Sequence, residues 1–381
     1  MTLVFQKQVV GPAATHALVI GVGSYPHLVG GAGPVLPNHE GMGQLTSAPI
    51  SARDFAFWLI DKYENPKKEL ATVELLLSDA QSSDFLLPRG QVVQVQRARM
   101  GAVSDAVLDW KRRGDGAAEN LLIFFFCGHG MGREDGVSLL LEDYGEVLEN
   151  PLKGAIAFLP GLYGGMNKCQ ARQQCYFIDA CRSYSRELIE SWNYGGDPII
   201  PGKASDQAPG GRRAPIYYST VAGSSSYGVS NTRSVFTEAL LKSLAGAGSD
   251  DCEGGWRIYT DRLNIGISHL VERTVGPAGL LDQVASTANL AQFTLHYLDG
   301  PPLVPVTVTC GSAAANRLAD LCYYRPGKPR VPREEKVESD WYPDIPKGTY
   351  RFAAAFPQGG YHDNEVKRPV RPAYKVIPIE V

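Results

Sequence analysis

The sequence contains no long apolar run and no strong excess of charge of either sign. No stretch of about 18 consecutive apolar residues occurs, so we expect no membrane-spanning helix. The segment from Met1 to Val10 lacks a basic start and a long apolar core, which argues against a secretory signal. The formal net charge is −3 over 381 residues, so nothing points to nucleic acid as a partner. We therefore expect a cytoplasmic protein that binds neither a membrane nor nucleic acid.

Motifs that would hold a metal or a disulfide framework are also missing. Seven cysteines are an odd number in a chain of this length, which does not fit a disulfide-rich scaffold. Neither Cys-x-x-Cys nor His-Glu-x-x-His occurs, so we expect no metal site and no cofactor. With 44% hydrophobic and 20% charged residues, the composition is typical of an ordinary globular protein.

Apolar runs of strand length alternate with amphipathic segments over most of the chain. The pattern predicts helices over 51–63, 102–113, 234–245 and 261–273 and strands over 16–22, 72–77, 121–126, 175–178, 215–221 and 291–298. A further short hairpin strand is expected at 137–142. Alternation of this kind predicts an α/β fold, a three-layer α/β/α sandwich around a mostly parallel six-stranded sheet.

A boundary is expected at Asp299-Gly300-Pro301-Pro302, where turn-forming residues follow the last of these strands. Beyond it, short strand-like runs separated by Pro, Gly and charge clusters cover 304–310, 319–324, 348–356 and 374–379. The sequence therefore predicts two domains, an α/β domain over 1–299 and a small all-β module over 300–381.

Two of the predicted strands stop abruptly at a reactive side chain. The run 121–126 leads into Cys127-Gly128-His129-Gly130, and the run 175–178 leads into Asp179-Ala180-Cys181. The carboxyl ends of parallel strands share one edge of a sheet, where ligands bind in such folds. A thiol beside an imidazole is a nucleophile beside its base, so we interpret Cys181 and His129 as a catalytic dyad.

The spacing and neighbours of these residues resemble a known family. His129 precedes Cys181 by 52 residues, and the segment around the thiol runs Asp179-Ala180-Cys181-Arg182-Ser183. In both respects the chain resembles the caspase superfamily, in particular its metacaspase-like and bacterial members. The resemblance covers roughly Thr15 to Leu298. Ser183 departs from the usual Gly and affects the geometry of the following loop more than the chemistry.

The resemblance implies further roles around the dyad. The backbone N–H groups of Gly130 and Cys181 would form the oxyanion hole. Asp179 would line the pocket for the residue before the cut and select Arg over Lys, through a charge-assisted bond to the substrate cation. In caspases proper the matching residue is Gln, and the pocket selects Asp instead. A structural role for Asp179, orienting a backbone loop, is the alternative.

Other pocket residues follow from the resemblance more weakly. Ser51 stands where relatives often have a second pocket acid, and Asp54 could compensate for that acid. Tyr217, Ser219 and Ala222 lie on or after the fifth predicted strand, where relatives form the pocket walls.

The stretch from Ser183 to Pro215 is long for a connection between strands. It matches the position of the caspase inter-subunit linker, and its Arg212-Arg213 pair would suit a peptidase that prefers basic residues. We hypothesise that cleavage there, by the protein itself or by an upstream protease, activates it. The alternative is a loop that is never processed.

Together these features predict a cysteine endopeptidase that acts on proteins or peptides after Arg or Lys, in prokaryotic defence or cell death. The alternative is a catalytically inactive caspase-like interaction module. A nucleotide-binding reading of Gly21-Val22-Gly23 fails, because Pro26 stands where the third Gly of the pattern is needed.

Overall fold

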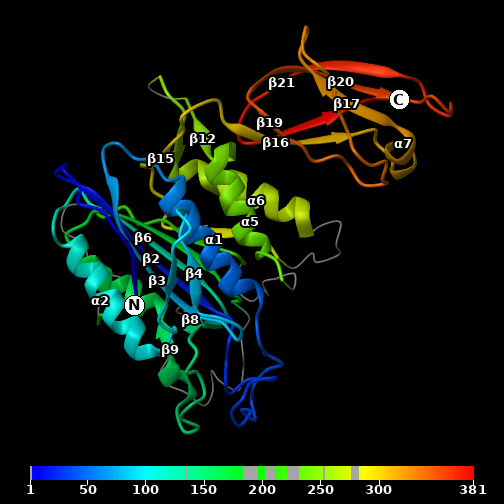
Figure 1. Cartoon of the computed structure of the whole chain (residues 1–381). Helices are drawn as coiled ribbons and strands as arrows, with labels where there is room; N and C mark the ends of the chain where they lie inside the picture. The colour runs from blue at the N-terminus through cyan, green and yellow to red at the C-terminus, as the bar shows by residue number, and fades with distance from the viewer. Residues whose placement is uncertain are drawn as a thin grey trace. The chain divides into compact units, whose positions relative to one another are not determined.

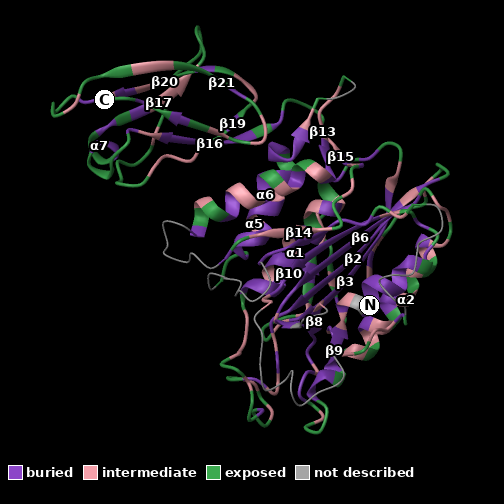
Figure 2. Ribbon diagram, turned by 180° about the vertical axis from the view of Figure 1, so that it is seen from behind, coloured by how far each residue is buried: buried purple, intermediate pink, exposed green. Residues whose placement is uncertain are grey.

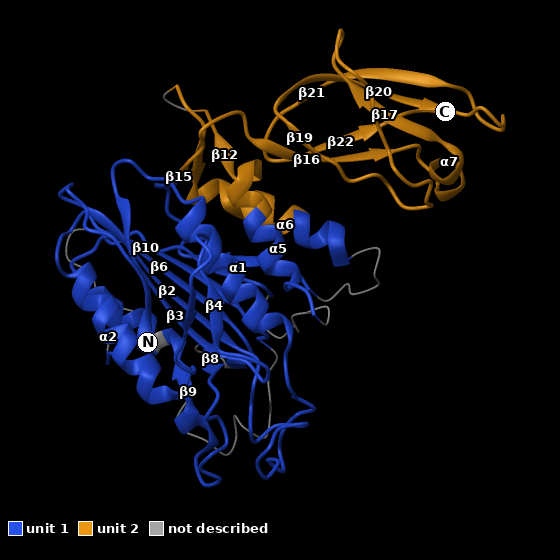
Figure 3. Cartoon of the chain, in the orientation of Figure 1, with its two compact units in different colours: residues 1–241, 270–295 blue, residues 242–269, 296–381 orange. Residues whose placement is uncertain are grey.

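The computed structural model describes residues 2–133, 136–182, 196–201, 211–220, 231–251, 254–275 and 283–381. Contacts within the chain define two compact units, residues 1–241 with 270–295 and residues 242–269 with 296–381 (Figure 3). The second unit thus takes in residues 242–269 in addition to the C-terminal module. The domain boundary at 299/300 stays a prediction.

A mostly parallel sheet forms the centre of the first unit (Figure 1). Neighbouring strands β2, β3, β6, β10 and β11 pair in parallel. Their bounds are β2 Ala14–Val22, β3 Glu69–Ser78, β6 Leu121–Cys127, β10 Gln173–Asp179 and β11 Ile216–Tyr218. Because these runs are apolar and buried on both faces (Figure 2), they are typical of parallel strands, and the predicted α/β class is confirmed.

The predicted count of six strands is wrong, because the sheet has seven strands in the described part of the chain. Short edge strands β1 (Leu3–Gln6) and β14 (Ser286–Ala288) are added antiparallel to β3 and β11. The expected sixth strand, β15 (Thr294–Tyr297), lies in a separate sheet with β12 (Ser249–Asp250) and β13 (Arg257–Tyr259). Alternation predicts that a segment is extended, but it does not predict the partner strand.

Helices cover both faces of the central sheet. Phe55 of α1 (Ser47–Asp61) stacks on Phe125 with ring centroids 4.5 Å apart. Trp110 of α2 (Met100–Gly114) contacts Phe124 at 6.0 Å. Because successive side chains of a strand point to opposite faces, α1 and α2 lie on opposite sides of the sheet. Two later helices follow, α5 (Val235–Lys242) and α6 (Thr260–Val275).

Several small elements lie in the connections between the strands of the sheet. Strands β7 (Gly130–Arg133), β8 (Gly136–Leu140) and β9 (Ala155–Ala157) form an antiparallel sheet directly after His129. Strands β4 (Asp84–Leu86) and β5 (Val92–Gln94) form a hairpin, and α3 (Tyr163–Gly165) is a single turn.

The C-terminal module packs two sheets around a core that includes Val306, Phe352 and Ile377. One sheet has the order β19-β16-β22 and the other β18-β17-β20-β21. The bounds are β16 Leu303–Thr309, β17 Asp320–Tyr324, β18 Val331–Pro332, β19 Asp344–Pro346, β20 Gly348–Ala355, β21 Asn364–Val370 and β22 Lys375–Pro378. The four predicted strands are present. The module also contains one short helix, α7 (Ala313–Leu318), which Ser312 caps through a hydrogen bond from the Ala315 N–H.

Of the helices in the described ranges, none combines the length and the apolar character needed to cross a membrane.

Candidate active site

The two strands that carry the predicted dyad are hydrogen-bonded neighbours. In the pairing of β6 with β10, Asp179 lies opposite Cys127, so His129 and Cys181 each follow their strand end by two residues. The Gly128 N–H donates to the Asp179 carbonyl at 3.2 Å, which keeps the two segments together beyond the last pair of the sheet. The structure thus brings the two motifs to one edge, as the topology predicts.

Gly130 lies directly against the nucleophile segment. A Cβ atom on Gly130 would lie 2.6 Å from the Cys181 carbonyl oxygen and 2.9 Å from the Ala180 Cβ. Such distances are too short for any side chain, so the close approach requires Gly. Cys181 is partly exposed and forms no disulfide among the described residues. Its exposure suits a nucleophile, whereas Cys127 and Cys175 are buried.

The hydrogen bonds of His129 fix its tautomer. Its Nε2 lies 2.7 Å from the Gly43 carbonyl oxygen, which can only accept, so Nε2 carries the proton. The Nδ1 atom then holds the lone pair that can take a proton from a thiol. Burial lowers the pKa of His129, and the bond to Gly43 only partly opposes this. Near neutral pH the ring is therefore a neutral base.

Tyr25, which the sequence motifs did not single out, contacts both the backbone and the ring of His129. Its hydroxyl accepts the His129 N–H at 2.8 Å and donates to the Leu140 carbonyl at 3.3 Å. The Tyr25 and His129 rings lie 4.8 Å apart. Burial raises the pKa of Tyr25 well above its usual value, so it stays a neutral phenol. The available signal was its position, just past the end of β2 at the same edge.

Asp179 is buried, with 3% of its surface exposed, and its carboxylate is held by neutral donors. One oxygen, Oδ2, accepts from the hydroxyls of Ser234 and Thr237 and from the Cys127 thiol at 3.3 Å. The Ser234 hydroxyl also accepts the Thr237 N–H at 3.0 Å, which places this oxygen at the N-terminus of α5. Hydroxyl donors and the helix dipole both stabilise a negative charge there.

The other predicted pocket residues separate into two groups. Ser51 is fully buried on α1, and its hydroxyl accepts the Ser234 N–H at 3.0 Å, so it belongs to the group around Asp179. Asp54 is instead 39% exposed and forms an ion pair with Arg233 at 2.7 Å. This pairing argues against Asp54 as the compensating pocket acid.

The predicted wall residues on β11 and beyond lie deeper than expected. Tyr217 is buried and stacks on Phe177 with centroids 5.2 Å apart. The Ser219 hydroxyl donates to the Ala180 carbonyl at 3.1 Å, which ties the end of β11 to the residue before Cys181. Ala222 lies outside the described residues.

The predicted processing pair is tied into the fold. Arg212 donates to Gln174 at 2.9 Å and to the Tyr176 hydroxyl at 3.1 Å, and its guanidinium lies 4.1 Å from the centre of the Tyr163 ring. The Arg213 N–H donates to the Arg172 carbonyl at 2.8 Å, and the Arg213 carbonyl accepts the Gln174 N–H at 3.0 Å. Since a peptidase needs an accessible extended segment, these contacts argue against cleavage at this pair in the folded protein. Residues 183–195 and 202–210 of the same stretch lie outside the described residues.

Comparison with known families identifies the fold and the kind of chemistry. The Caspase domain family matches the chain over residues 14–255. The protein belongs to the caspase domain family. The predicted resemblance to caspases and the predicted α/β class are therefore confirmed. The family match also supports the predicted class of protein, a cysteine peptidase whose substrates are proteins.

Two individual proteins are similar to this caspase-domain chain. The uncharacterized protein y4kE of Sinorhizobium fredii is 27% identical over 251 residues, covering 64% of this chain and 70% of that protein. The crystal structure of caspase-1 from Spodoptera frugiperda superposes with a TM-score of 0.38 at 12% identity, covering 76% of this chain and 94% of that one.

Among the residues that the structure describes, no group of three or more His, Cys, Asp or Glu side chains could hold a metal ion.

Proposed function

We propose that this caspase-domain protein is a cysteine endopeptidase that cleaves after Arg, and less readily after Lys. Cys181 is the nucleophile and His129 is the general base and acid. The observation that carries the proposal is the pairing of the two strand ends, with His129 held as the Nε2–H tautomer by Gly43. A neutral base and a partly exposed thiol then follow neighbouring strands.

The chemistry follows from these groups. The Cys181 sulfur attacks the scissile carbonyl while its proton passes to His129 Nδ1, and the carbonyl oxygen becomes an oxyanion. The N–H groups of Gly130 and Cys181 stabilise that oxyanion. The proton on Nδ1 then moves to the leaving amine as the C–N bond breaks, which leaves a thioester. Water, deprotonated by the same nitrogen, hydrolyses the thioester and restores the thiol.

The preference for basic residues rests on Asp179. Asp179 is the last residue of β10, two residues before Cys181, and the hydroxyls of Ser234 and Thr237 hold its Oδ2 atom. An oriented carboxylate favours a guanidinium, which offers donors in a fixed fork, over an ammonium. An acidic substrate side chain would meet like charge and be excluded.

Two further parts of the proposal are activation by proteolysis within residues 183–215 and a role in prokaryotic defence or cell death, and both come mainly from the family resemblance. A cytoplasmic location is proposed from the amino-acid composition.

Matched fluorogenic peptides ending in Arg, Lys or Asp test the proposal directly. We expect the wild-type chain to hydrolyse the Arg peptide fastest and Cys181→Ala and His129→Ala to be inactive. Cys322→Ala, which removes another partly exposed thiol, is the control and should remain active. Preferential cleavage of the Asp peptide would refute the assignment of Asp179 and keep the dyad. Activity that survives Cys181→Ala would refute the dyad.

A further inference from the structure

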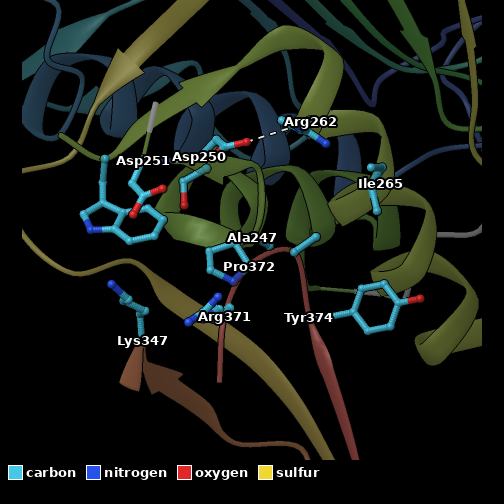
Figure 4. Close-up of a pocket in the computed structure, with 12 residues that line it drawn as sticks. Ala247, Asp250, Asp251, Arg262, Ile265, Lys347, Arg371, Pro372 and Tyr374 are labelled. Carbon is cyan, nitrogen blue, oxygen red and sulfur yellow. Dashed lines mark hydrogen bonds and ion pairs between the residues drawn. The ribbon is translucent and has the colours of Figure 1, made fainter. Parts of the chain in front are cut away.

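A cavity of about 520 Å³ lies within the second unit, far along the chain from the dyad residues. One wall comes from β12 and α6, and the other from Lys347 and the segment 371–374 that leads into β22. Figure 4 shows Asp250 and Asp251 on one side of the opening and Lys347 and Arg371 on the other.

Three of the five charged side chains that line this cavity have no salt-bridge partner among the described residues. Arg262 pairs with Asp250 at 3.2 Å. Within the ranges that the structure describes, Asp251, Lys347 and Arg371 form no salt bridge. One wall therefore offers the carboxylate of Asp251 to a ligand, and the facing wall offers the cations of Lys347 and Arg371.

The cavity also offers apolar contact. Lys347 Nζ lies 4.8 Å from the centre of the Trp256 ring, which holds the ammonium by a cation–π contact. Ile265 is 44% exposed and Tyr374 39% exposed. The Tyr374 ring stacks on His269 with centroids 3.4 Å apart, which restricts its motion. An aliphatic stem could lie along these side chains.

We propose that this cavity binds the C-terminal basic residue of a peptide. The α-carboxylate is held by Lys347 and Arg371, and the Arg or Lys side chain by Asp251 on the facing wall. Such a residue carries one charge of each sign, which matches the two walls. A nucleoside phosphate fits less well, because it carries only negative charge and would face Asp250 and Asp251.

Peptide binding in this cavity does not depend on peptidase activity, because every lining residue belongs to the second unit, whereas His129 and Cys181 belong to the first. A peptidase that cuts after Arg would, however, release peptides with this kind of end. The site would then bind the products of the proposed reaction.

Calorimetric titration of the full-length Cys181→Ala chain tests this proposal. The probe is an N-acetylated tetrapeptide that ends in Arg with a free carboxylate and has no other charge. We expect its C-terminal amide and its Gln-ended analogue each to bind roughly tenfold more weakly. Arg371→Gln and Lys347→Met should weaken the Arg peptide by a similar factor. Asp251→Asn should weaken the Arg peptide and leave the Gln analogue unchanged.

Two surface variants and one active-site variant control the experiment. Arg368→Gln and Glu380→Gln alter exposed charges that do not line the cavity, so they should bind as the parent does. Binding that is lost in Asp179→Asn and retained in Arg371→Gln would belong to the candidate active site and overturn the proposal. Absence of binding at millimolar peptide, or tighter binding of adenosine monophosphate than of the Arg peptide, would also overturn it. Unchanged binding after Asp179→Asn would support a site separate from the candidate active site. Loss of Arg-peptide hydrolysis when Asp179→Asn is made in the chain that keeps Cys181 would support the proposed function independently.

Discussion

At the scale of single residues, the candidate site depends on backbone groups as much as on side chains. The Gly43 carbonyl decides which nitrogen of His129 carries the proton, and the Gly130 backbone meets the Cys181 carbonyl without an intervening side chain. Each of these contacts tolerates little change, because displacing main-chain atoms costs more free energy than displacing the end of a flexible side chain.

Replacing Gly130 by Ala should therefore impair catalysis without unfolding the protein. The new Cβ would push the Cys181 peptide away by several tenths of an ångström and displace the oxyanion donors. Loss of one donor typically lowers kcat by about 10²–10³-fold, and we expect a loss in this range. Steady-state kinetics and a thermal melt would measure the two effects. Gly101→Ala, on α2 with no atom within 4 Å of the new Cβ, is the control and should leave kcat unchanged.

Thr237 offers a test of how Asp179 is positioned. Thr237→Val keeps the shape of the side chain and removes its 2.8 Å hydrogen bond to Oδ2. We expect kcat/KM for Arg peptides to fall by about tenfold, because hydrogen bonds to charged groups contribute about 1.5–3 kcal/mol. Alkylation of Cys181 by iodoacetamide should keep its rate, since the dyad is untouched.

The control for this change is Thr274→Val, whose hydroxyl donates to the Leu270 carbonyl one turn earlier in α6. Equal loss of kcat/KM in both variants would show that the effect of Thr237→Val is not specific to Asp179.

At the scale of elements, the register of β6 against β10 decides which side chains meet. Because the side chains of a strand alternate between faces, a slip of one residue would turn Asp179 away from α5 and towards the face of α2. The segment at Arg212 contributes to holding β10 in place, through its bonds to Gln174 and Tyr176.

We expect Arg212→Ala to act on stability rather than on processing. The change removes the hydrogen bonds from Arg212 to the buried Gln174 and Tyr176 and its cation–π contact with Tyr163, which should lower the free energy of unfolding by about 2–4 kcal/mol. Urea denaturation would measure this. Arg213→Ala removes a mostly exposed side chain and should cost less than about 1 kcal/mol. Equal effects of the two changes would contradict this view of the segment.

At the scale of the whole molecule, a buried histidine couples folding to pH. His16 on β2 lies in the sheet, with Nδ1 2.9 Å from the Thr72 hydroxyl. Burial, assisted by the nearby Arg113, lowers the pKa of His16 from 6.5 to about 4. The unfolded chain therefore takes up a proton at a higher pH than the folded chain does.

The sign of the effect on stability follows from this difference. The stability associated with neutral His16 is complete above pH 6.5 and is lost as the pH falls towards 4. Between about pH 7 and pH 5 we expect the free energy of unfolding to fall by about 2 kcal/mol more in the wild type than in His16→Gln. Urea titrations of both proteins at each pH would measure this, and parallel curves would contradict it.

Much of the first unit could be predicted from the sequence because its signals are local. The buried runs at 16–22, 121–126 and 175–178 mark parallel strands by their composition alone. Their order then places His129 and Cys181 at one edge. Short edge strands such as β14, with the sequence Ser-Thr-Ala, carry no apolar signal and were missed. The partner sheet of β15 was also missed, because strand pairing is a long-range choice.

The sequence by itself determined the α/β class and the edge of the sheet that His129 and Cys181 share, and it predicted these two residues as a dyad, since a buried strand that ends at a thiol or an imidazole is a local pattern. Only the tertiary structure decided what surrounds them. The Gly43 carbonyl, the Tyr25 hydroxyl and the donors on α5 come from segments distant in the chain. No local pattern marks such contacts, because a hydrogen-bond partner is selected by how the elements pack rather than by its neighbours in sequence.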